Sequence, residues 1–572
     1  MHKQNKRQFE TRIGCLQFVL NACIFLLLGY LFLTQVFDIR GYKDRAKYQR
    51  TLTPFVLRGG IVDRNGIKLA SDDTSFNLYA HPQYYDNSPS ELAQTLSPLL
   101  NMPEGELEKK LSSTDSVILL KKGIDRKTAD KIKELRLREL SFEVKNKRVY
   151  PQGSLASHVL GFYNPDADMA GGVEYVAGDY LKYIDKSIRY EKTPNGDIIY
   201  NLSLDPEDVS TPAVGKTLQL TIDSAIQHIC EKYLTQMIQK TNALRGAVIV
   251  MEPKTGDILA FAVYPNYDPN NYSKYSLLEM KNWALTDVYP PGSTFKIITV
   301  ACAFLTNKIT KNEKIMDTGK MKVGWWEILN YDYYDKGAPG LIDLVYLFQH
   351  SSNIASIKVA QKMSSEEFYD ALQLFGYGQR TGIDLPGEST GLLSKPSMWD
   401  TAMHASMGYG YGSSVTAIQM AAAVNAIAND GVWITPHVIK YSDDSAKEKV
   451  IKRRIMTEEQ AHDLRDILVK SIDLSASKMD DYQIAAKTGT SRRPNDNGVG
   501  YSNKVYASMI GFLPASNPKV TIYVVIDSAQ KGAVWGSTVA APVFRDVATE
   551  IIRILNLNPD KENPNPLKKS KN

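Results

Sequence analysis

The chain has 572 residues, of which 43% are hydrophobic and 23% are charged. It is too long for one compact core and too apolar to be disordered throughout, so two or three folded units are expected. The formal net charge of +5 is small for this length and argues against a nucleic-acid binder that tracks phosphates. The four cysteines are too few for a disulfide-stapled scaffold, and their spacing predicts no metal site.

The most apolar stretch of the chain covers residues 13–37 and contains no charged residue. It is long enough to span a bilayer, and it ends without the small-residue cleavage site of a signal peptide. We therefore expect one uncleaved transmembrane helix over 13–37, with a short tail of residues 1–12 before it. Basic residues stand on both sides of the span, so the charge pattern alone does not orient the helix.

A first region follows the span and extends to residue 215. It mixes short strand-like runs, such as 75–80, with helical patterns at 90–100 and 126–137. We recognise no catalytic pattern in this region.

A second region, residues 216–555, begins with a strand-like alternation at 218–222, and Asp223 is placed to cap the helix that follows. Two β runs, 247–251 and 258–263, flank a Pro/Gly turn and predict a hairpin. Helical patterns then continue to about residue 470, and three late strands are expected at 482–486, 507–512 and 520–526. This order predicts an α+β fold with an antiparallel sheet and a helical subdomain. The Asn-, Pro- and Lys-rich tail 556–572 is expected to be disordered.

Three short motifs of active-site serine acyl-transferases occur in this second region: Ser-x-x-Lys, Ser-x-Asn and Lys-Thr-Gly. Ser293 and Lys296 follow a Pro-Pro-Gly punctuation and precede an apolar run, which predicts an abrupt helix start with both side chains on one face. The positive helix amino terminus disfavours an ammonium there, so Lys296 is expected to be a neutral base for Ser293. The other copies, at Ser475, Ser516 and Ser528, lack this helix start, and we interpret them as non-catalytic.

The second motif, Ser351-Ser352-Asn353, lies between two helical patterns and predicts a turn. Two interpretations stay open. The turn could be no more than a buried cap. Alternatively, the Ser351 hydroxyl relays a proton to a leaving amine, and the Asn353 amide orients Lys296 and a substrate carbonyl.

The third motif, Lys487-Thr488-Gly489-Thr490, follows the strand-like run 482–486 and is expected at the end of that strand. The charge of Lys487 would attract a substrate carboxylate and lower the pKa of Lys296, while Thr488 and Thr490 offer hydroxyls to the same carboxylate. Gly489 is expected to let a substrate backbone approach closely. An earlier copy, residues 254–256, falls in the hairpin turn, and we interpret it as turn chemistry.

In this order and with these flanks, the motifs resemble the penicillin-binding proteins, specifically the class B membrane-anchored transpeptidases of peptidoglycan synthesis. Further similar segments are found at 58–66, 148–151, 171–174, 375–378, 382–388, 408–410 and 540–544. The second motif and Gly408-Tyr409-Gly410 are more similar to the cell-division branch than to the elongation branch. The resemblance implies an inner-membrane protein with a cytoplasmic amino terminus. It further implies a pedestal (dimerisation-like) domain over 38–215 and an extracytoplasmic transpeptidase domain over 216–555.

The resemblance also implies an acyl transfer that needs no cofactor. Ser293 would attack the penultimate D-Ala of a stem peptide ending in D-Ala-D-Ala, with the N–H groups of Ser293 and Thr490 as the oxyanion hole. An amine of a second stem peptide would take the acyl group, and β-lactams would acylate the same serine. The alternatives are an elongation-type transpeptidase, a D,D-carboxypeptidase, and a β-lactam sensor that retains the pocket.

Four charged residues near the similar segments, Arg58, Asp63, Arg64 and Glu174, are interpreted as a structural network that stiffens the pedestal. A second hypothesis follows from the resemblance alone. In that hypothesis the network transmits signals to a SEDS-family glycan polymerase, in a complex with other division membrane proteins.

Overall fold

The computed structural model describes residues 2–36, 51–52, 56–165, 167–182, 190–192, 198–199, 213–472, 479, 481–495 and 500–561. The chain divides into two compact units. The first consists of residues 1–57 and 182–215, and the second of residues 58–181 and 216–572. Most of the predicted pedestal region therefore belongs to the same unit as the predicted transpeptidase region.

The first unit contains the long helix α1 (His2–Val36). Within it, Arg12–Leu33 is long and apolar enough to cross a membrane, with a mean hydropathy of 2.2, and its side chains are exposed. The predicted apolar helix is present, and its expected end at residue 37 lies outside the described residues. The described residues of this unit also form short strands: β1 (Thr51–Leu52), β2 (Val56–Leu57), β9 (Tyr190–Lys192), β10 (Ile198–Ile199) and β11 (Ala213–Val214).

The pedestal part of the second unit is built on a sheet with the strand order β12-β3-β4-β5, in which β6 also pairs with β4. The strands are β3 (Ile61–Val62), β4 (Lys68–Ala80), β5 (Ile118–Ile124), β6 (Leu140–Val149) and β12 (Leu218–Gln219). Three helices contribute to the same hydrophobic core: α3 (Pro89–Leu100), α4 (Glu104–Leu111) and α5 (Arg126–Glu134). The helices predicted at 90–100 and 126–137 and the strand predicted at 75–80 are confirmed as α3, α5 and β4. Helix α5 ends at Glu134, earlier than expected.

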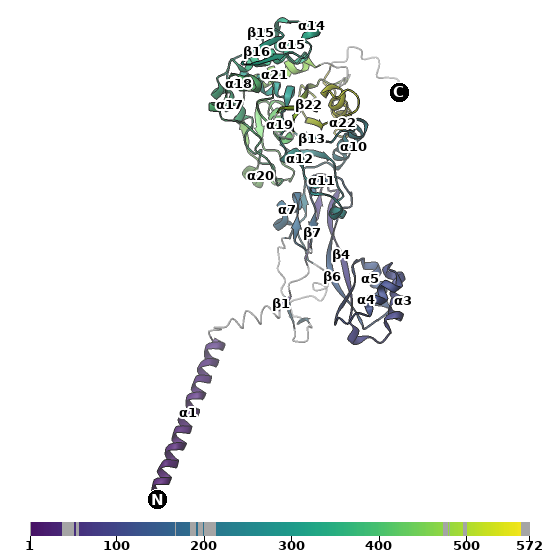
Figure 1. The fold of residues 1–572 in the computed structure, drawn as a ribbon, viewed down its shortest axis with the longest axis vertical. Coiled ribbons are helices and arrows are strands. Elements are labelled where there is room, and N and C mark those ends of the chain that lie inside the picture. Colours follow the sequence, from purple (N-terminus) through teal and green to yellow (C-terminus); the bar gives the residue numbers. More distant parts are fainter. Residues whose placement is uncertain are drawn as a thin grey trace. The chain divides into compact units, whose positions relative to one another are not determined.

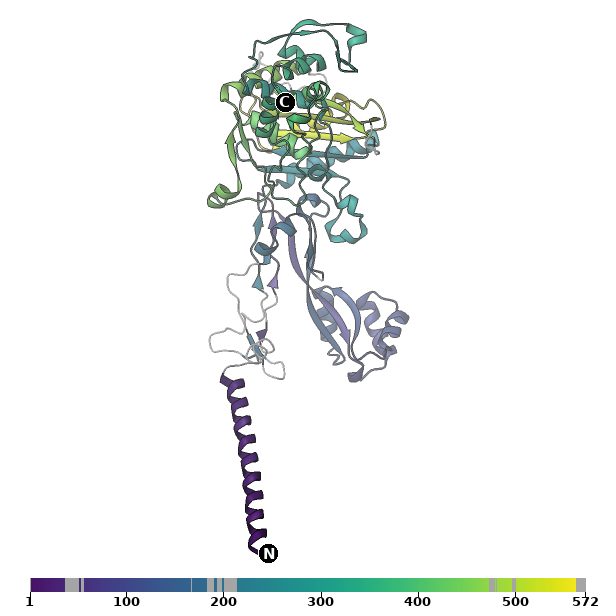
Figure 2. The same ribbon diagram turned by 60° about the vertical axis from the view of Figure 1, so that its left-hand side comes forward.

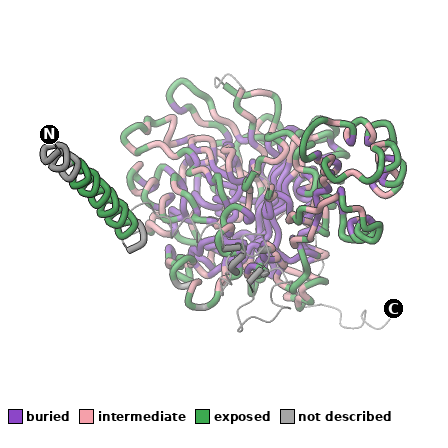
Figure 3. The backbone as a smooth tube through the Cα atoms, turned by 90° about the horizontal axis from the view of Figure 1, so that it is seen from below, coloured by how far each residue is buried: buried purple, intermediate pink, exposed green. Residues whose placement is uncertain are grey.

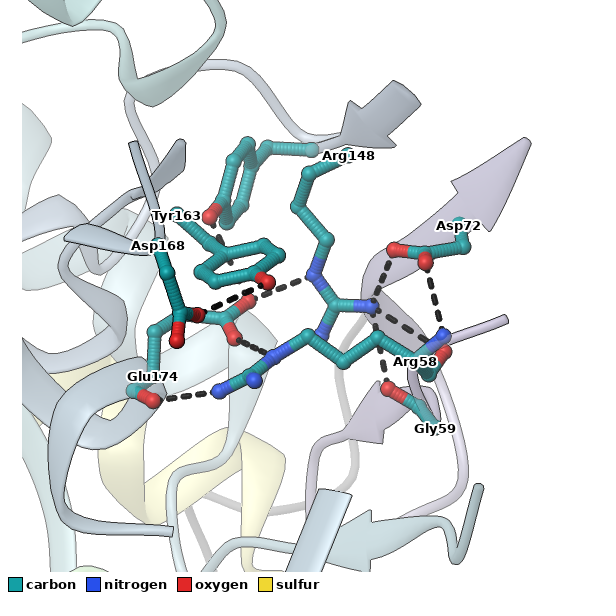
Figure 4. A network of polar contacts seen from close by, with 8 residues as sticks. Arg58, Gly59, Asp72, Arg148, Tyr163, Asp168 and Glu174 are labelled. Atoms are coloured by element: carbon teal, nitrogen blue, oxygen red, sulfur yellow. Dashed lines mark hydrogen bonds and ion pairs between the residues drawn. The ribbon is translucent and has the colours of Figure 1, made fainter. Parts of the chain in front are cut away.

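A buried charge network lies in the pedestal part (Figure 4). Both oxygens of the Glu174 carboxylate are paired: Arg58 Nε lies 2.7 Å from one, and Arg148 Nε lies 2.6 Å from the other. Arg148 also pairs with Asp72 at 3.0 Å. The network that the sequence predicted therefore exists, but two of its members were wrong.

Asp63 and Arg64 do not belong to this network. The Asp63 carboxylate instead accepts backbone hydrogen bonds from Asn65, Ile67 and Ser224, which fixes the turn after β3. Arg64 lies 4.0 Å from Glu252 in a half-exposed pair. Arg148 and Asp72 take their places, because strand pairing in the β4–β6 register sets these two residues opposite each other.

The part of the second unit that corresponds to the predicted transpeptidase region (216–555) is organised around a five-stranded antiparallel sheet with the order β14-β13-β23-β22-β21 (Figure 1). Its strands are β13 (Arg245–Met251), β14 (Ile258–Tyr264), β21 (Ala485–Pro494), β22 (Tyr501–Leu513) and β23 (Val520–Asp527). The predicted hairpin and the strands expected at 507–512 and 520–526 are confirmed, whereas the strand expected at 482–486 begins only at Ala485 and continues to Pro494. Every residue of β23 is buried, which requires cover on both faces of the sheet.

Helices cover both faces. On one face, α10 (Ser224–Thr241) and α22 (Ala541–Ile554) share a core with Val248, Val250 and Val524. On the other face, α13 (Lys296–Leu305), α19 (Ala417–Ala428) and α21 (Glu458–Ser471) share the larger core with Tyr523 and Val525. Alternate residues of each strand therefore face different cores. Figure 3 shows the buried residues concentrated in the middle of this unit. As predicted, Asp223 caps α10, accepting from the N–H groups of Ala225 and Ile226.

Between α13 and α19 the chain forms an excursion, the first elements of which Figure 2 shows in teal at the upper edge of this part. Its elements are β15 (Lys314–Asp317), β16 (Lys320–Val323), β17 (Trp326–Leu329), α14 (Tyr333–Lys336), β18 (Gly340–Asp343), α15 (Leu344–Gln349), α16 (Asn353–Ala360), α17 (Ser365–Leu374) and α18 (Thr401–Gly408). Smaller elements elsewhere in the second unit are α6 (Ser157–Leu160), β7 (Tyr163–Asn164), β8 (Met169–Ala170), α7 (Gly172–Val176), α8 (Gly178–Lys182), α11 (Leu277–Met280), α12 (Trp283–Thr286), β19 (Val432–Ile434), α20 (Asp443–Lys449) and β20 (Lys452–Arg454).

Two predicted boundaries differ from the structure. The strand expected at 218–222 is only two residues long, because the backbone then changes partner: Leu220 forms an isolated bridge with Ile439, and the Thr221 N–H donates to the Val438 backbone oxygen. The chain is also held by contacts beyond the expected end of the domain at 555. Asp560 accepts hydrogen bonds from the N–H groups of Gln483 and Ser516, so the chain is held in place up to this point, and residues 562–572 lie outside the described residues.

Candidate active site

The first motif lies at a break between two kinds of helix. Ser293 is in the 3₁₀ turn Gly292–Phe295, and Lys296 begins α13 directly after it. Gly292 has φ of +59°, and a Cβ atom there would lie 2.8 Å from Cβ of Ser491. The abrupt helix start that the sequence predicted is therefore present, and the turn that carries Ser293 packs directly on β21.

Lys296 is fully buried, and its amine reaches the second motif. Nζ donates to the Asn353 side-chain oxygen at 2.8 Å and to the Ser351 backbone oxygen at 2.5 Å, and it lies 3.2 Å from the Ser351 hydroxyl. The first two partners can only accept a hydrogen bond. The hydroxyl is the one contact that can also donate a proton to a neutral amine.

The pKa of Lys296 is held well below its ordinary value. Burial is the largest cause, and the positive charge of Lys487 is the second, while the negative charge of Asp317 acts in the opposite direction. Sequence reasoning predicted a neutral Lys296 and named Lys487, but it did not name burial. That cause depends on the packing of α13 against α16 and α18, which no local pattern reveals.

The second motif forms the expected turn between α15 and α16. Ser351 has φ of +52°, and the Ser352 hydroxyl caps α16 by accepting from the N–H of Ala355 at 2.9 Å. Asn353 Nδ2 donates to the Leu329 backbone oxygen at 2.9 Å, which turns its Oδ1 toward Lys296. Both interpretations of this motif therefore apply, to different residues: Ser352 caps the helix, while Ser351 and Asn353 contact the lysine.

The third motif lies in β21, at the start of the strand and not at its end as expected. Its cation, Lys487, is buried, and burial lowers its pKa to about 8. Lys487 Nζ donates to the Thr488 backbone oxygen at 2.8 Å, and the Thr490 hydroxyl accepts from the N–H of Gly536 at 3.0 Å.

Gly489 serves packing within the protein. A Cβ atom on this residue would lie 2.8 Å from the Ser508 hydroxyl oxygen and 2.9 Å from a methyl carbon of Thr294. On this side of Gly489 the space is occupied by protein side chains, which allows β21 to approach the turn that carries Ser293, and Gly489 also lines the cavity that the three motifs share.

The three motifs share one cavity of about 580 Å³. Ser293, Ser351, Asn353 and Lys487 to Thr490 line it, with aromatic side chains at Tyr331, Tyr409, Tyr411 and Trp535. Lys296 does not line the cavity and lies behind its wall. The structure therefore brings together every predicted site residue, and it places the lysine behind the residues that a ligand would meet.

The other copies of the motifs lie in ordinary structural contexts. Residues 254–256 form the hairpin turn between β13 and β14, and Lys254 pairs with Asp430. The Ser516 and Ser528 hydroxyls donate to Asp560 and Asp527, respectively. Ser475 and Lys478 lie outside the described residues.

Sequence reasoning missed two residues beneath the site, Asp317 and Asn330. Both are buried and bind the second-motif turn. They belong to no short motif. The sequence pattern predicted helices up to about residue 470, whereas this segment forms β15 and β17, so no predicted element pointed to these two residues.

Comparison with known proteins agrees with this arrangement. Residues 246–549 match the family described as "Penicillin binding protein transpeptidase domain", and residues 55–219 match the "Penicillin-binding Protein dimerisation domain". The chain is 32% identical over 562 residues to the "Probable peptidoglycan D,D-transpeptidase PenA" of Neisseria meningitidis, covering 96% of this chain and 94% of that protein.

A second relative is the "Peptidoglycan D,D-transpeptidase FtsI" of Escherichia coli, 29% identical over 88% of this chain and 84% of that protein. Among solved structures, that of Penicillin Binding Protein 2X from Streptococcus thermophilus has the same fold, with a TM-score of 0.71 at 22% identity over 88% of this chain and 80% of that one. Together with the shared cavity of the three motifs, these matches show that the chain belongs to the class B penicillin-binding proteins.

Proposed function

We propose that this protein is a peptidoglycan D,D-transpeptidase that uses Ser293 as nucleophile and Lys296 as its base. One observation carries the proposal. The buried amine of Lys296 is hydrogen-bonded to Ser351 and Asn353, and these two residues line the same cavity as Ser293 and Lys487. A nucleophile and a cationic strand thus line one space of substrate size, and a base with a lowered pKa lies behind its wall, bonded to the second motif.

In the acylation step, Ser293 Oγ attacks the carbonyl carbon of the penultimate D-Ala, and Lys296 takes the hydroxyl proton. The tetrahedral intermediate then collapses, the C–N bond breaks, and the terminal D-Ala leaves with a proton delivered through the Ser351 hydroxyl, which lies 3.2 Å from Lys296 Nζ. The N–H groups of Ser293 and Thr490 would stabilise the oxyanion, and one such donor contributes about 3 kcal/mol.

The terminal carboxylate of the donor peptide would bind at β21. Lys487 supplies the positive charge, and the Thr488 and Thr490 hydroxyls line the cavity beside it. A β-lactam carries a carboxylate and a reactive carbonyl in a similar arrangement, so it would form the same ester with Ser293.

In the second half of the reaction, an amine of another stem peptide attacks the ester carbonyl, forms the cross-link and returns the proton to Ser293. The ester retains the reactivity of the cleaved peptide bond, so the step needs no nucleotide. Peptidoglycan stem peptides are thus both donor and acceptor.

We place this activity in septal synthesis during cell division. Similarity to a protein named FtsI supports this, as do the second motif and Gly408-Tyr409-Gly410. We further propose a single-pass inner-membrane protein with a cytoplasmic tail (1–12), a pedestal domain (38–215) and an extracytoplasmic transpeptidase domain (216–555). The SEDS-family glycan polymerase and other division membrane proteins are the partners we propose for it.

Product analysis tests the proposal. The full-length protein in detergent is incubated with donor and acceptor stem peptides that end in D-Ala-D-Ala, and the products are separated by mass. Cross-linked dimers with release of one D-Ala are expected. Release of D-Ala without dimers would instead indicate a carboxypeptidase. The absence of both products would indicate a β-lactam sensor.

A further inference from the structure

A buried carboxylate lies directly beneath the second motif. Asp317 ends β15 and is fully buried. Its oxygens accept hydrogen bonds from Gly319 N at 2.8 Å, from Asn330 Nδ2 at 2.9 and 3.1 Å, and from the Ser352 hydroxyl at 2.6 Å. All of these donors are neutral groups, and no ion pair of Asp317 occurs among the described residues.

Asn330, directly after β17, connects this carboxylate to the turn of the second motif, Ser351 to Asn353. Its Nδ2 faces Asp317, so its Oδ1 faces the other way, where it accepts from the backbone N–H groups of Asn353 at 2.8 Å and Ile354 at 3.2 Å. Asn353 in turn holds Lys296 Nζ at 2.8 Å. A continuous chain of contacts therefore runs from Asp317 through Asn330 and Asn353 to the lysine.

We propose that Asp317 and Asn330 form a positioning pair for the acyl-transfer reaction, fixing the second-motif turn so that Asn353 and Ser351 meet the Lys296 amine. The inference rests on the proposed function, because it assigns a purpose to the contacts of the base. Neither residue lines the cavity, so neither is expected to touch substrate.

The chemistry explains why a charged residue is needed at position 317. A buried carboxylate is costly unless hydrogen bonds compensate it, and a neutral residue would avoid that cost. A carboxylate, however, can only accept, so it forces the Asn330 amide to present its NH₂ group to Asp317 and its oxygen to the turn. An amide at position 317 could place one NH₂ group against another, or flip Asn330 so that its NH₂ group faces the N–H of Asn353.

The charge of Asp317 also acts on the base. The charged groups that act on Lys296 among the described residues are Lys487, on β21, and Asp317, on β15. The first lowers the pKa of the amine and the second raises it. Asp317 therefore limits how far burial and Lys487 depress the pKa of Lys296, in addition to its effect through hydrogen bonds.

The test compares three variants of the full-length protein: Asp317→Asn, Asn330→Ala, and the exchanged double variant Asp317→Asn with Asn330→Asp. The readout is the acylation rate of Ser293 by a fluorescent penicillin, measured from pH 5 to pH 9 on protein whose thermal unfolding is followed in parallel. Asp343→Asn is the matched control, because Asp343 lies on β18, the partner strand of β15, and only caps α15 and pairs with exposed Lys314.

Each single variant is expected to acylate about 5- to 100-fold more slowly than the Asp343→Asn control, the effect of one mismatched buried hydrogen bond. The exchanged variant is expected to recover most of the rate. Its amide at position 317 can donate to the new carboxylate at position 330, and that carboxylate can still accept from the N–H groups of the turn. The ascending limb of the pH profile should move to lower pH in Asp317→Asn, since losing the negative charge lowers the pKa of Lys296.

The inference is overturned if Asp317→Asn and Asn330→Ala acylate at the rate of the control, or if they lose thermal stability while the folded protein keeps the wild-type rate and pH profile. Should Asp317→Asn not fold, Asn330→Ala and the exchanged variant give the same decision. A wild-type protein that the penicillin does not label at Ser293 would refute the proposed function instead, so the two failures are distinguishable.

Discussion

Nζ of Lys296 lies 2.8 Å from Oδ1 of Asn353, although the two residues are 57 positions apart in the sequence. This contact joins the first motif to the second across the excursion that carries β15 to β18. It holds the amine in the protein interior. There, burial and the positive charge of Lys487 both favour the neutral form of the amine.

A permanently charged group at position 296 should abolish general-base catalysis. We expect Lys296→Arg to lower the rate of Ser293 acylation by about 10²- to 10⁴-fold, because a guanidinium stays protonated and cannot accept the hydroxyl proton. The rate is measured with a fluorescent penicillin. Lys311→Arg, at an exposed pair with Asp463, is the control and should match the wild type. A Lys296→Arg variant that acylates as fast as this control would exclude Lys296 as the base.

Removal of the Lys487 charge should move the pH profile in a defined direction. Lys487 disfavours the protonated form of Lys296, so Lys487→Gln should raise the pKa of Lys296. The neutral amine would then appear only at higher pH, and the ascending limb of the acylation rate would shift upward, opposite to the shift expected for Asp317→Asn. A limb that stays in place or moves to lower pH would contradict the electrostatic coupling of the two lysines.

The pedestal network should contribute strongly to stability. Arg148→Ala leaves Glu174 and Asp72 buried with fewer partners, and breaking such a buried pair costs about 3–5 kcal/mol. Urea unfolding of the full-length protein in detergent measures the loss. Arg126→Ala, which removes an exposed pair with Asp130, is the control. Equal stability of the two variants would mean that the buried network is not structural.

His437 should make stability depend on pH. Its Nε2 lies 3.0 Å from Asp257, and its Nδ1 lies 3.1 Å from the Thr435 backbone oxygen, so only the protonated ring satisfies both acceptors. Burial opposes the charge, but the carboxylate prevails and raises the pKa of His437, while Asp257 has its pKa lowered to about 2.

Because the folded-state pKa of His437 is raised, its contribution is complete below the unfolded value of about 6.5 and is lost as pH rises through the folded pKa. The contribution of Asp257 is present above its unfolded value of about 3.9 and is lost as pH falls toward 2. Thermal unfolding should therefore show that this pair contributes most to the stability between about pH 3.9 and pH 6.5. His437→Gln should remove the loss on the alkaline side, and an unchanged pH dependence in that variant would contradict the assignment.

Much of the site could be predicted from the sequence, because its chemistry resides in short motifs whose flanking patterns mark local structure. The Pro-Pro-Gly run before Ser293 marks the helix start, and the apolar runs around Ser351 mark the turn. The hairpin and the late strands were equally clear from their β runs.

The rest depends on contacts between distant segments. Asp317 and Asn330 reach the second motif only because β15 and β17 fold back onto α16, and no spacing in the sequence records this. In the same way, Arg148 and Asp72 were missed as members of the Glu174 network, because the β4–β6 register, and not proximity in sequence, brings them together. The reason for Gly489 was also hidden, since the atoms that exclude a side chain there come from Thr294 and Ser508.

The most direct test of the account is to locate the covalent adduct of a β-lactam. The full-length protein is treated with benzylpenicillin, digested, and mapped by mass spectrometry beside the Ser293→Ala variant. We predict one modified peptide, with the adduct on Ser293 and no adduct in the variant. An adduct on another serine, such as Ser516, or undiminished labelling of Ser293→Ala would contradict the assignment of the nucleophile and the mechanism built on it.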